Sequence, residues 1–168
     1  MGPITYCPRT YAGFTWIELL IVLAVAAVLA LLSIPAMHEG VLRRQVKESL
    51  GLADVAKHAV QETLSMTGEM PADNKAAMLP EPEKIVGSHV SAVHVRDGAI
   101  TLVLGNNANR VLHGRKITLR PAIVPDEPVV PIAWLCHLIN VPKGMEVRGR
   151  DETDLSPDTL PVECRAGP

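Results

Sequence analysis

The sequence FTWIELLIVLAVAAVLALLSIPA, residues 14–36, decides the architecture of this chain. Its central part, residues 19–32, is apolar without a break. At a helical rise of about 1.5 Å per residue, residues 14–36 reach across roughly the 30 Å hydrocarbon core of a bilayer. Beyond Ala36 the composition becomes that of an ordinary soluble domain. We therefore predict a transmembrane helix over residues 14–36, followed by a head domain over residues 37–168.

The position of Gly13 separates this segment from a secretory signal peptide. Such a signal peptide places its small-residue cleavage site after the apolar run. Here the small residue comes before the run, at the end of a polar leader that carries Arg9. A cut between Gly13 and Phe14 would remove the leader, residues 1–13, and the mature chain would begin with its apolar helix.

Glu18 is unusual because it places a carboxylate inside the apolar segment. A charged side chain costs about 2.5 to 3.5 kcal/mol at the centre of a membrane helix, and less near an end. One interpretation places Glu18 at the helix end, among the lipid headgroups. The other is intermolecular: cleavage exposes the amine of Phe14, and the amine of a neighbouring copy pairs with Glu18 once the helices pack side by side.

The N-terminal segment resembles the class III signal of type IV pilins, in which a glycine is followed by FTLIE and a long apolar run containing a proline. The residues that carry this resemblance are Gly13, Phe14, Thr15, Ile17, Glu18, Leu19 and Pro35. The resemblance implies that a prepilin peptidase cuts between Gly13 and Phe14 and N-methylates Phe14. It also implies that Glu18 serves filament assembly rather than cleavage. Trp16 stands where the family usually has leucine.

Pro35 predicts a weak point in the helix. Its ring removes one backbone hydrogen bond and clashes with the carbonyl of the preceding turn, so the helix should kink or melt locally there. The resemblance implies that this stretch unravels during assembly and lets the subunits extend.

The three cysteines become an even pair if the leader is removed. Cys7 lies in the leader, so that Cys136 and Cys164 remain. In an exported chain such a pair predicts one disulfide, closing a loop of roughly 28 residues and contributing about 3 to 4 kcal/mol in the chain-entropy model. Two unpaired thiols are the alternative.

The beginning of the head shows the pattern of an amphipathic helix. Apolar residues recur at steps of three or four and predict a helix over residues 41–66. These residues are Leu42, Val46, Leu50, Ala53, Ala56, Val60 and Leu64. Residues 67–88 are rich in proline and small polar residues, which is typical of a loop.

The remainder of the head predicts a β-meander over residues 89–138. Alternating apolar residues mark strands at 89–95, 99–104, 116–124 and 132–138. Asp97-Gly98 marks a hairpin turn, and Pro121 requires a sheet edge or a strand end. The predicted fold class is α+β, with a long N-terminal helix packed on a four-stranded antiparallel sheet and a C-terminal disulfide loop over residues 136–164.

The resemblance extends into the head. Residues 114–121 (GRKITLRP), 132–136 (IAWLC) and 160–164 (LPVEC) are similar to the last third of type IVa major pilins. This implies that Cys136 and Cys164 bound a disulfide loop at the filament surface, and that Trp134 packs in the core close to it.

Composition and motif searches argue against several other classes of protein. A net charge of −2 produces no field that favours nucleic acid, and 3% aromatic residues are too few for an aromatic cofactor pocket. None of the six histidines forms a metal-binding pair at helical spacing. Cys136 and His137 come nearest to a catalytic cysteine–histidine pair, but adjacent residues on a strand point to opposite faces. We predict no metal site, no cofactor and no enzymatic activity.

The sequence therefore predicts a structural subunit of a type IV pilus, serving adhesion, twitching motility or DNA uptake. Expected partners are further copies of the chain, the prepilin peptidase, the inner-membrane assembly machinery and, before assembly, membrane lipid. The precursor would cross the inner membrane once, and the mature subunit would form an extracellular pilus.

Three alternatives remain open. A type II secretion pseudopilin shares the cleavage signal but typically lacks the Trp-x-Cys sequence and the C-terminal cysteine loop. A permanently anchored periplasmic enzyme predicts no processing at Gly13. A minor pilin that binds DNA needs a basic stripe, for which the candidates are Arg110, Arg115, Lys116, Arg120, Lys143, Arg148, Arg150 and Arg165, with acidic residues interleaved.

Overall fold

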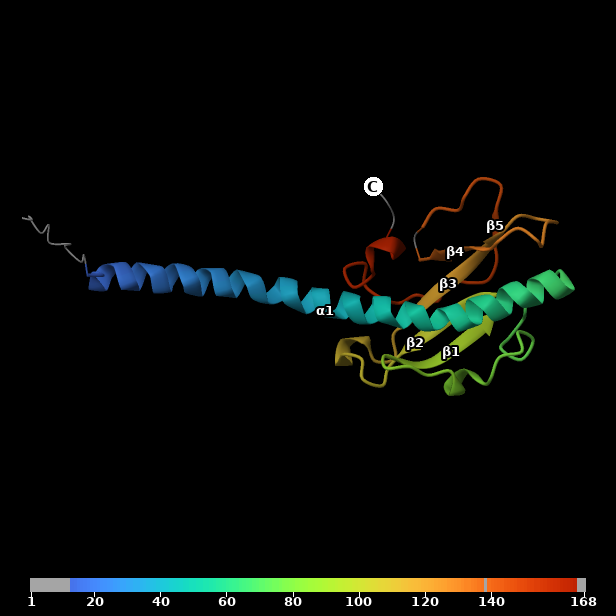
Figure 1. The fold of residues 1–168 in the computed structure, drawn as a ribbon, viewed down its shortest axis with the longest axis horizontal. Coiled ribbons are helices and arrows are strands. Elements are labelled where there is room, and N and C mark those ends of the chain that lie inside the picture. The colour runs from blue at the N-terminus through green and yellow to red at the C-terminus, as the bar shows by residue number, and fades with distance from the viewer. Residues whose placement is uncertain (1–12, 138, 166–168) are drawn as a thin grey trace, which may run out of the picture. The chain divides into compact units, whose positions relative to one another are not determined.

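The computed structural model describes residues 13–137 and 139–165, except for the side chains of residues 32–38. One long helix precedes an antiparallel sheet and three short 3-10 turns (Figure 1). The elements are α1 (Trp16–Thr67), η1 (Pro82–Lys84), β1 (Val90–Arg96), β2 (Ala99–Leu104), η2 (Arg110–Leu112), β3 (Lys116–Ile123), β4 (Ala133–Cys136), β5 (Glu146–Val147) and η3 (Val162–Cys164). Contacts divide the chain into two units, residues 1–37 and residues 38–168.

The first unit contains the apolar part of α1. Among the described residues, no helix combines the length and the apolar character that a membrane span requires. The predicted span over 14–36 extends into residues 32–36, whose side chains lie outside the description. The predicted weak point at Pro35 falls there too and stays a prediction, although α1 is helical throughout its length.

The second half of α1 lies across one face of the sheet (Figure 1). Of the seven apolar residues predicted to form its buried stripe, six are buried, and Leu50 is partly buried against the core. The helix ends at Thr67, one residue after the predicted end at residue 66, and Gly68, at φ 74°, donates its N–H to Leu64 O over 2.8 Å. A glycine in the left-handed region is a common helix C-terminus because it has no Cβ to clash.

The sheet has the order β1-β2-β3-β4, with every pair antiparallel, which confirms the predicted four-stranded meander. The hairpin turn between β1 and β2 is made by Asp97 (φ 48°) and Gly98 (φ 77°), also as predicted. The structure adds a short fifth strand, β5, which pairs with β3. The prediction missed it because a strand of two residues has no periodicity.

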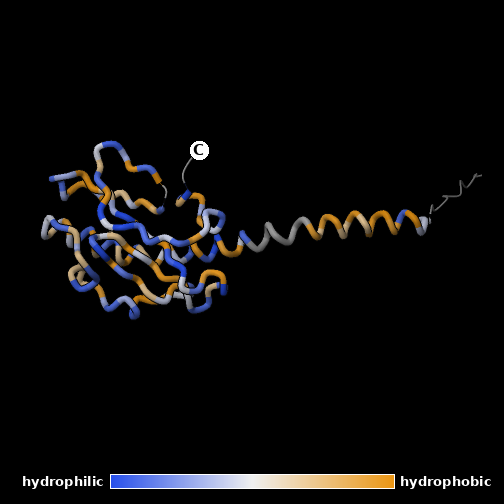
Figure 2. The backbone as a smooth tube through the Cα atoms, turned by 180° about the vertical axis from the view of Figure 1, so that it is seen from behind, coloured by the Kyte–Doolittle hydropathy of each residue, from blue (hydrophilic) through white to orange (hydrophobic). Residues whose placement is uncertain are grey.

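One hydrophobic core joins the helix, the sheet and the C-terminal region. The largest fully buried side chains come mainly from the strands, but Val46 and Val60 of α1 and Leu160 near the C-terminus belong to the same group. Along the backbone tube in Figure 2, apolar and polar residues alternate in much of the head, whereas the described part of the first unit is almost uniformly apolar. The C-terminal region is therefore an integral part of the head's core.

Pro121 lies inside β3, a strand with neighbours on both sides. Because proline has no N–H, the sequence had predicted a sheet edge or a strand end at this residue. The structure resolves this conflict locally. Pairing of β3 with β2 stops at Leu119, and the carbonyl of Pro121 accepts a hydrogen bond from Arg148 N on that side, over 2.9 Å. The missing N–H of Pro121 therefore faces a position that β2 does not occupy.

Candidate functional site

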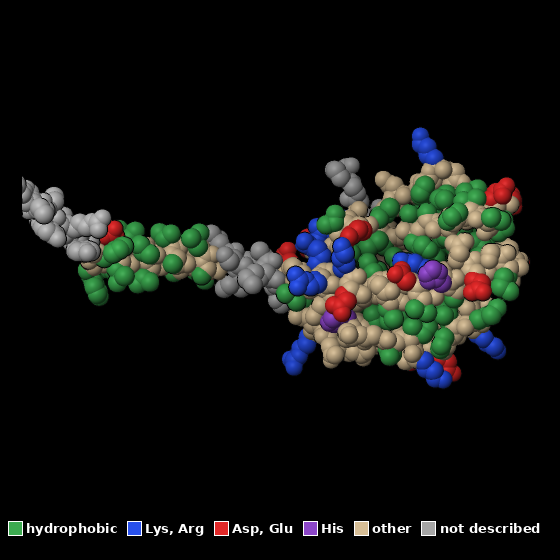
Figure 3. Space-filling view, viewed as in Figure 1, with side chains coloured by type: hydrophobic (Ala, Val, Ile, Leu, Met, Phe, Trp, Pro, Cys, Tyr) green, Lys and Arg blue, Asp and Glu red, His purple; other side chains and the backbone are tan. Residues whose placement is uncertain are grey.

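The described N-terminal half of α1 is an apolar helix with exposed side chains. All residues from Gly13 to Leu31 are exposed, with Phe14 79% and Trp16 76% accessible. Figure 3 shows hydrophobic side chains around this part of the helix. Contiguous apolar surface on this scale marks a site of contact with lipid or with another protein.

Glu18 lies in the first turn of this helix. Thr15 immediately precedes the helix, and its Oγ1 accepts a hydrogen bond from the backbone N–H of Glu18 over 3.3 Å. This is the N-terminal capping arrangement, in which a threonine satisfies the N–H three residues later. A carboxylate in the first turn also interacts favourably with the helix dipole. Glu18 is thus partly stabilised within its own chain.

This capping role of Thr15 was not predicted from the sequence. The spacing Thr-x-x-Glu before an apolar run was visible in the sequence and is a known signal for the start of a helix. Gly13 and Phe14 precede the helix in irregular backbone, so the predicted cleavage point lies just outside the regular hydrogen-bonded structure.

The second candidate region surrounds the predicted disulfide. Cys136 at the end of β4 is bonded to Cys164 in η3, and both residues are buried. The predicted disulfide loop is therefore confirmed. Trp134 differs from its prediction: it is partly buried rather than interior, and it lines a surface cavity of about 440 Å³ beside Lys57 and Gln61 of α1. Its indole packs against the core.

Acidic residues of the disulfide loop hold cations of the sheet. Glu152 contacts Arg96 of β1 over 2.7 Å and Lys116 of β3 over 3.0 Å. The hydrogen bond from the Lys116 ammonium is the largest influence that lowers the pKa of the Glu152 carboxyl. Burial raises the pKa of Asp151, but hydrogen bonds from Thr153 and His137 outweigh it and leave that pKa lowered. Both carboxylates therefore stabilise the fold in their charged form.

Three of the eight cations of the candidate basic stripe are paired with carboxylates, and two more donate to backbone carbonyls. Arg115, Lys116 and Arg148 form ion pairs with Asp154, Glu152 and Glu146, respectively. The Arg120 guanidinium donates to His137 O, and that of Arg165 donates to Asp158 O and Leu160 O. Counterion release from DNA needs cations that are available to phosphates. This distribution gives no support to a DNA-binding groove.

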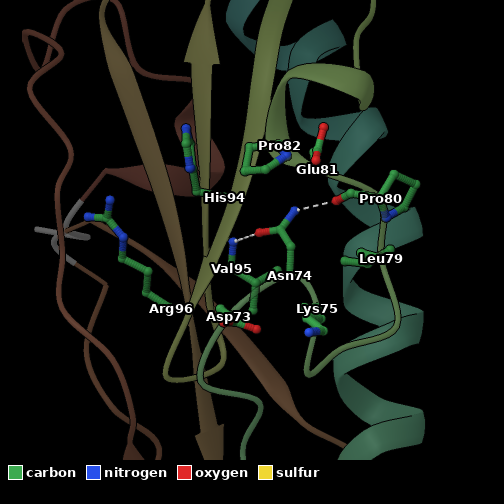
Figure 4. A pocket seen from close by; sticks show the side chains of 10 residues that line it. All are labelled: Asp73, Asn74, Lys75, Leu79, Pro80, Glu81, Pro82, His94, Val95 and Arg96. Atoms are coloured by element: carbon green, nitrogen blue, oxygen red, sulfur yellow. Dashed lines mark hydrogen bonds between the residues drawn. The ribbon is translucent and has the colours of Figure 1, made fainter.

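A surface cavity of about 490 Å³ lies between the loop after α1 and the outer edge of β1 (Figure 4). Asn74 occupies this edge: its amide accepts from Val95 N over 2.7 Å and donates to Val93 O over 2.9 Å. Burial and the neighbouring Arg96 lower the pKa of His94, which also lines the cavity. Asn74 takes the place of a neighbouring strand, and sequence periodicity gave no signal for this role.

Two glutamines of α1 tie the helix to loops of the sheet. Gln45 Oε1 accepts from Asn109 N over 2.9 Å, and Gln61 Oε1 accepts from Ile132 N over 3.1 Å. Within the described residues, no group of three or more histidine, cysteine, aspartate or glutamate side chains could hold a metal ion. The ion pairs and hydrogen bonds described in the head hold its own elements together. The long stretch of exposed apolar residues, from Phe14 to Leu31, lies on the N-terminal helix.

The exposed apolar helix and the disulfide-closed head have counterparts in a known protein family. The family model described as "Pilin (bacterial filament)" matches residues 43–165. The chain belongs to the pilin family. A second model, the prokaryotic N-terminal methylation motif, matches residues 8–34 of this pilin, a range that contains Gly13, Phe14 and Glu18.

Curated relatives of this pilin come from several bacteria. It is 37% identical over 157 residues to a type IV major pilin protein PilE1 of Neisseria gonorrhoeae, covering 91% of this chain and 93% of the relative. It is 37% identical over 108 residues to a fimbrial protein of Neisseria meningitidis serogroup A, covering 64% of each chain. The fimbrial protein EcpC of Eikenella corrodens is 36% identical over 111 residues, or 64% of this chain and 72% of the relative. The pilin thus spans just under two thirds of the meningococcal protein's length.

Proposed function

We propose that this pilin is a structural subunit of a type IV pilus, built by packing the N-terminal helices of many copies together. The observation that carries the proposal is the N-terminal half of α1, whose apolar side chains are exposed from Phe14 to Leu31. An all-round apolar helix needs lipid or other helices as its surroundings. The relatives' names, major pilin and fimbrial protein, support the same role.

Processing is the first step of the proposal. The prepilin peptidase would cut between Gly13 and Phe14 and methylate the new amine of Phe14. Support comes from the irregular backbone at both residues and from the N-terminal methylation motif that matches residues 8–34. Before the cut the precursor would sit in the inner membrane by its single apolar helix, in contact with the pilus assembly machinery. Afterwards the subunit would belong to an extracellular pilus.

Glu18 and Pro35 would act during assembly. The amine of Phe14 in one copy would pair with Glu18 of its neighbour, which removes two charges from apolar surroundings at once. The helix dipole lowers the cost of the Glu18 carboxylate before this partner arrives, and the Thr15 cap holds the backbone N–H of Glu18 in the first turn. Pro35 would allow the helix to unravel locally as the filament forms.

Two measurements test the proposal together. Mass spectrometry of the protein from cells should find N-methylated Phe14 at the start of the mature chain, and a chain that retains residues 1–13 would contradict processing. Glu18→Ala should leave this cleavage intact and abolish filaments in electron micrographs of sheared cells. Filaments as abundant as those of the unmodified chain would refute the pairing of Glu18 with Phe14.

A matched variant separates pairing from capping. Thr15→Ala removes the hydroxyl that caps the helix but keeps the Glu18 carboxylate, so filaments should persist. If Thr15→Ala and Glu18→Ala lose filaments equally, Glu18 acts through the start of the helix rather than through an intermolecular charge.

The alternatives receive less support. A type II secretion pseudopilin typically lacks the Trp134–Cys136 sequence and the C-terminal cysteine loop, both present here. Membership of a filament-protein family leaves a permanently anchored enzyme without support. DNA binding by the head would need free cations, whereas Arg115, Lys116 and Arg148 are paired with carboxylates.

A further inference from the structure

The two neighbours of β3 are staggered along it. β2 pairs with β3 only from Lys116 to Leu119, and β4 pairs only from Leu119 to Ala122. β2 and β4 thus leave part of each side of β3 unpaired. We call these two positions the half-edges of β3: Pro121–Ile123 on the β2 side and Lys116–Thr118 on the β4 side. An open half-edge presents unpaired N–H and C=O groups to any other chain.

One segment of the disulfide loop fills both half-edges, and we call it the strap, residues 146–154. Its first part, β5, pairs with Ala122 and Ile123, and Arg148 N donates to Pro121 O. Ala122 also pairs with β4, so β5 must lie on the opposite side of β3, the side where β2 has ended.

The end of the strap serves the other half-edge. Asp154 N donates to Lys116 O over 3.2 Å, and Lys116 N donates to the Asp154 carboxylate over 2.6 Å. Thr118 N donates to Thr153 Oγ1 over 3.0 Å. A segment of nine residues therefore completes the hydrogen bonding of the strand that lies in the middle of the sheet.

The strap has to cross β3 between its two ends, and two residues make the crossing possible. Gly149 has φ +72°, and a Cβ at this position would come within 2.4 Å of Ala99 Cβ and 3.1 Å of Arg96 O. Glu152 then bridges Arg96 of β1 and Lys116 of β3. The strap is thus specific to this surface in shape, in hydrogen bonding and in charge.

The disulfide determines which copy the strap can reach. Cys136 at the end of β4 and Cys164 in η3 close the loop that contains the strap, so a closed loop keeps the strap on its own sheet. Residues 140–144, which precede the strap, are exposed, and at roughly 3.3 Å per residue such a segment can extend toward a neighbouring copy. Once the disulfide is reduced, no closed loop holds the strap on the β3 of its own chain.

We propose that the strap is exchangeable between copies of this chain once the Cys136–Cys164 bond is reduced. A dithiol reductant would supply two electrons, break the S–S bond and leave two thiols, while itself becoming a disulfide. The strap of a second copy then fits both half-edges of β3 with the same hydrogen bonds, and residues 155–164 exchange with it, so that Cys164 of that copy comes to lie beside Cys136 of the first. Reoxidation by a small disulfide joins Cys136 of one copy to Cys164 of the other and releases two small thiols.

The test uses full-length chains in detergent micelles, with Cys7→Ala in every chain. A donor carrying Cys136→Ser retains only Cys164, and an acceptor carrying Cys164→Ser retains only Cys136. The two are mixed under reducing conditions and then treated with oxidised glutathione. We expect a disulfide-linked mixed dimer on a non-reducing gel, with the Cys136–Cys164 peptide identified by mass spectrometry. Absence of this peptide would overturn the proposal.

A charge-reversal series distinguishes exchange from chance collision between micellar helices. Glu152→Lys in the donor places a cation against Arg96 and Lys116 of the acceptor, and the yield of mixed dimer should fall several-fold. Arg96→Glu with Lys116→Glu in the acceptor should restore it. Equal yields across the series would show that the thiols meet without seating of the strap and would also overturn the proposal.

Discussion

The two halves of α1 belong to one continuous helix but meet opposite surroundings. From Phe14 to Leu31 every side chain is exposed, and almost all of them are apolar. In the head half, one face is buried completely, with Val46, Ala53 and Val60 at 0% exposure, whereas Arg44, Lys47 and Glu48 on the other faces are exposed. Only the head half finds the partner for its apolar surface within the same chain.

This difference shows which surfaces are covered within the same chain and which remain exposed. The head covers several strand edges itself: Asn74 occupies the outer edge of β1, and the strap fills both half-edges of β3. Strand pairing with other chains is thereby discouraged. The apolar half of α1 carries no such protection. With the Cys136–Cys164 disulfide closed, the structure thus favours the N-terminal helix as the site of intermolecular contact, which agrees with the proposed filament.

The largest effect should come from placing a charge in each half of α1. Val60→Asp buries an unpaired carboxylate in the head and should lower its free energy of unfolding by about 3 to 5 kcal/mol. Val25→Asp is the matched change at a residue that is 53% exposed, and it should leave unfolding of the head unchanged while preventing filaments. Urea unfolding in detergent, followed by circular dichroism, measures the first effect. Equal destabilisation by both changes would break the comparison.

The next effect should come from opening the disulfide. Cys164→Ser removes the cross-link over 28 residues and should lower the free energy of unfolding by about 3 to 4 kcal/mol. The same urea titration measures the loss. A loss below about 1 kcal/mol would mean that the hydrogen bonds of the strap, rather than the disulfide, hold the loop.

A smaller effect is expected at the crossing of the strap. Gly149→Ala introduces a Cβ against Ala99 and Arg96 at a positive φ, and should cost about 2 to 4 kcal/mol. Gly114→Ala has a similar φ of +74° but nothing within 4 Å of the new Cβ, so only the cost of the backbone, about 1 kcal/mol, should remain. Thermal unfolding of the two variants should therefore differ clearly, and equal midpoints would argue against a tight crossing.

The smallest effect concerns pH. The pKa of Glu152 is lowered in the folded chain, chiefly by Lys116, so its contribution to stability is present above the unfolded pKa and is lost as the pH falls through the folded pKa. Glu152→Gln should cost under about 1 kcal/mol at neutral pH and should make stability less dependent on pH below its ordinary value of 4.5. Urea midpoints between pH 3 and 7 provide the measurement. Unchanged acid sensitivity would assign the loss to other carboxylates, with Asp151 as the first candidate.

Much of the fold could be predicted because it depends on local patterns. The stripe from Leu42 to Leu64 predicted the buried face of α1, and Asp97-Gly98 predicted the first hairpin. The cysteine pair was also visible once Cys7 was assigned to the leader. The candidate site was harder to predict from the sequence. The cap at Thr15 had a signal in the sequence, Thr-x-x-Glu, that was not used. The hydrogen bonds of the Asn74 amide to β1 join residues far apart in the chain, which hydrophobic periodicity does not predict.

By itself, the sequence determined the division into an apolar helix and a mixed head, the order of the elements, and the residues predicted for processing and assembly. It could do so because hydrophobic period and turn chemistry act over a few neighbouring residues. Only the tertiary structure decided that Pro121 is tolerated inside β3, that Trp134 lies at the edge of the core, and that residues 146–154 complete both sides of one strand. These features depend on where neighbouring strands end, and that is set by packing of the whole head.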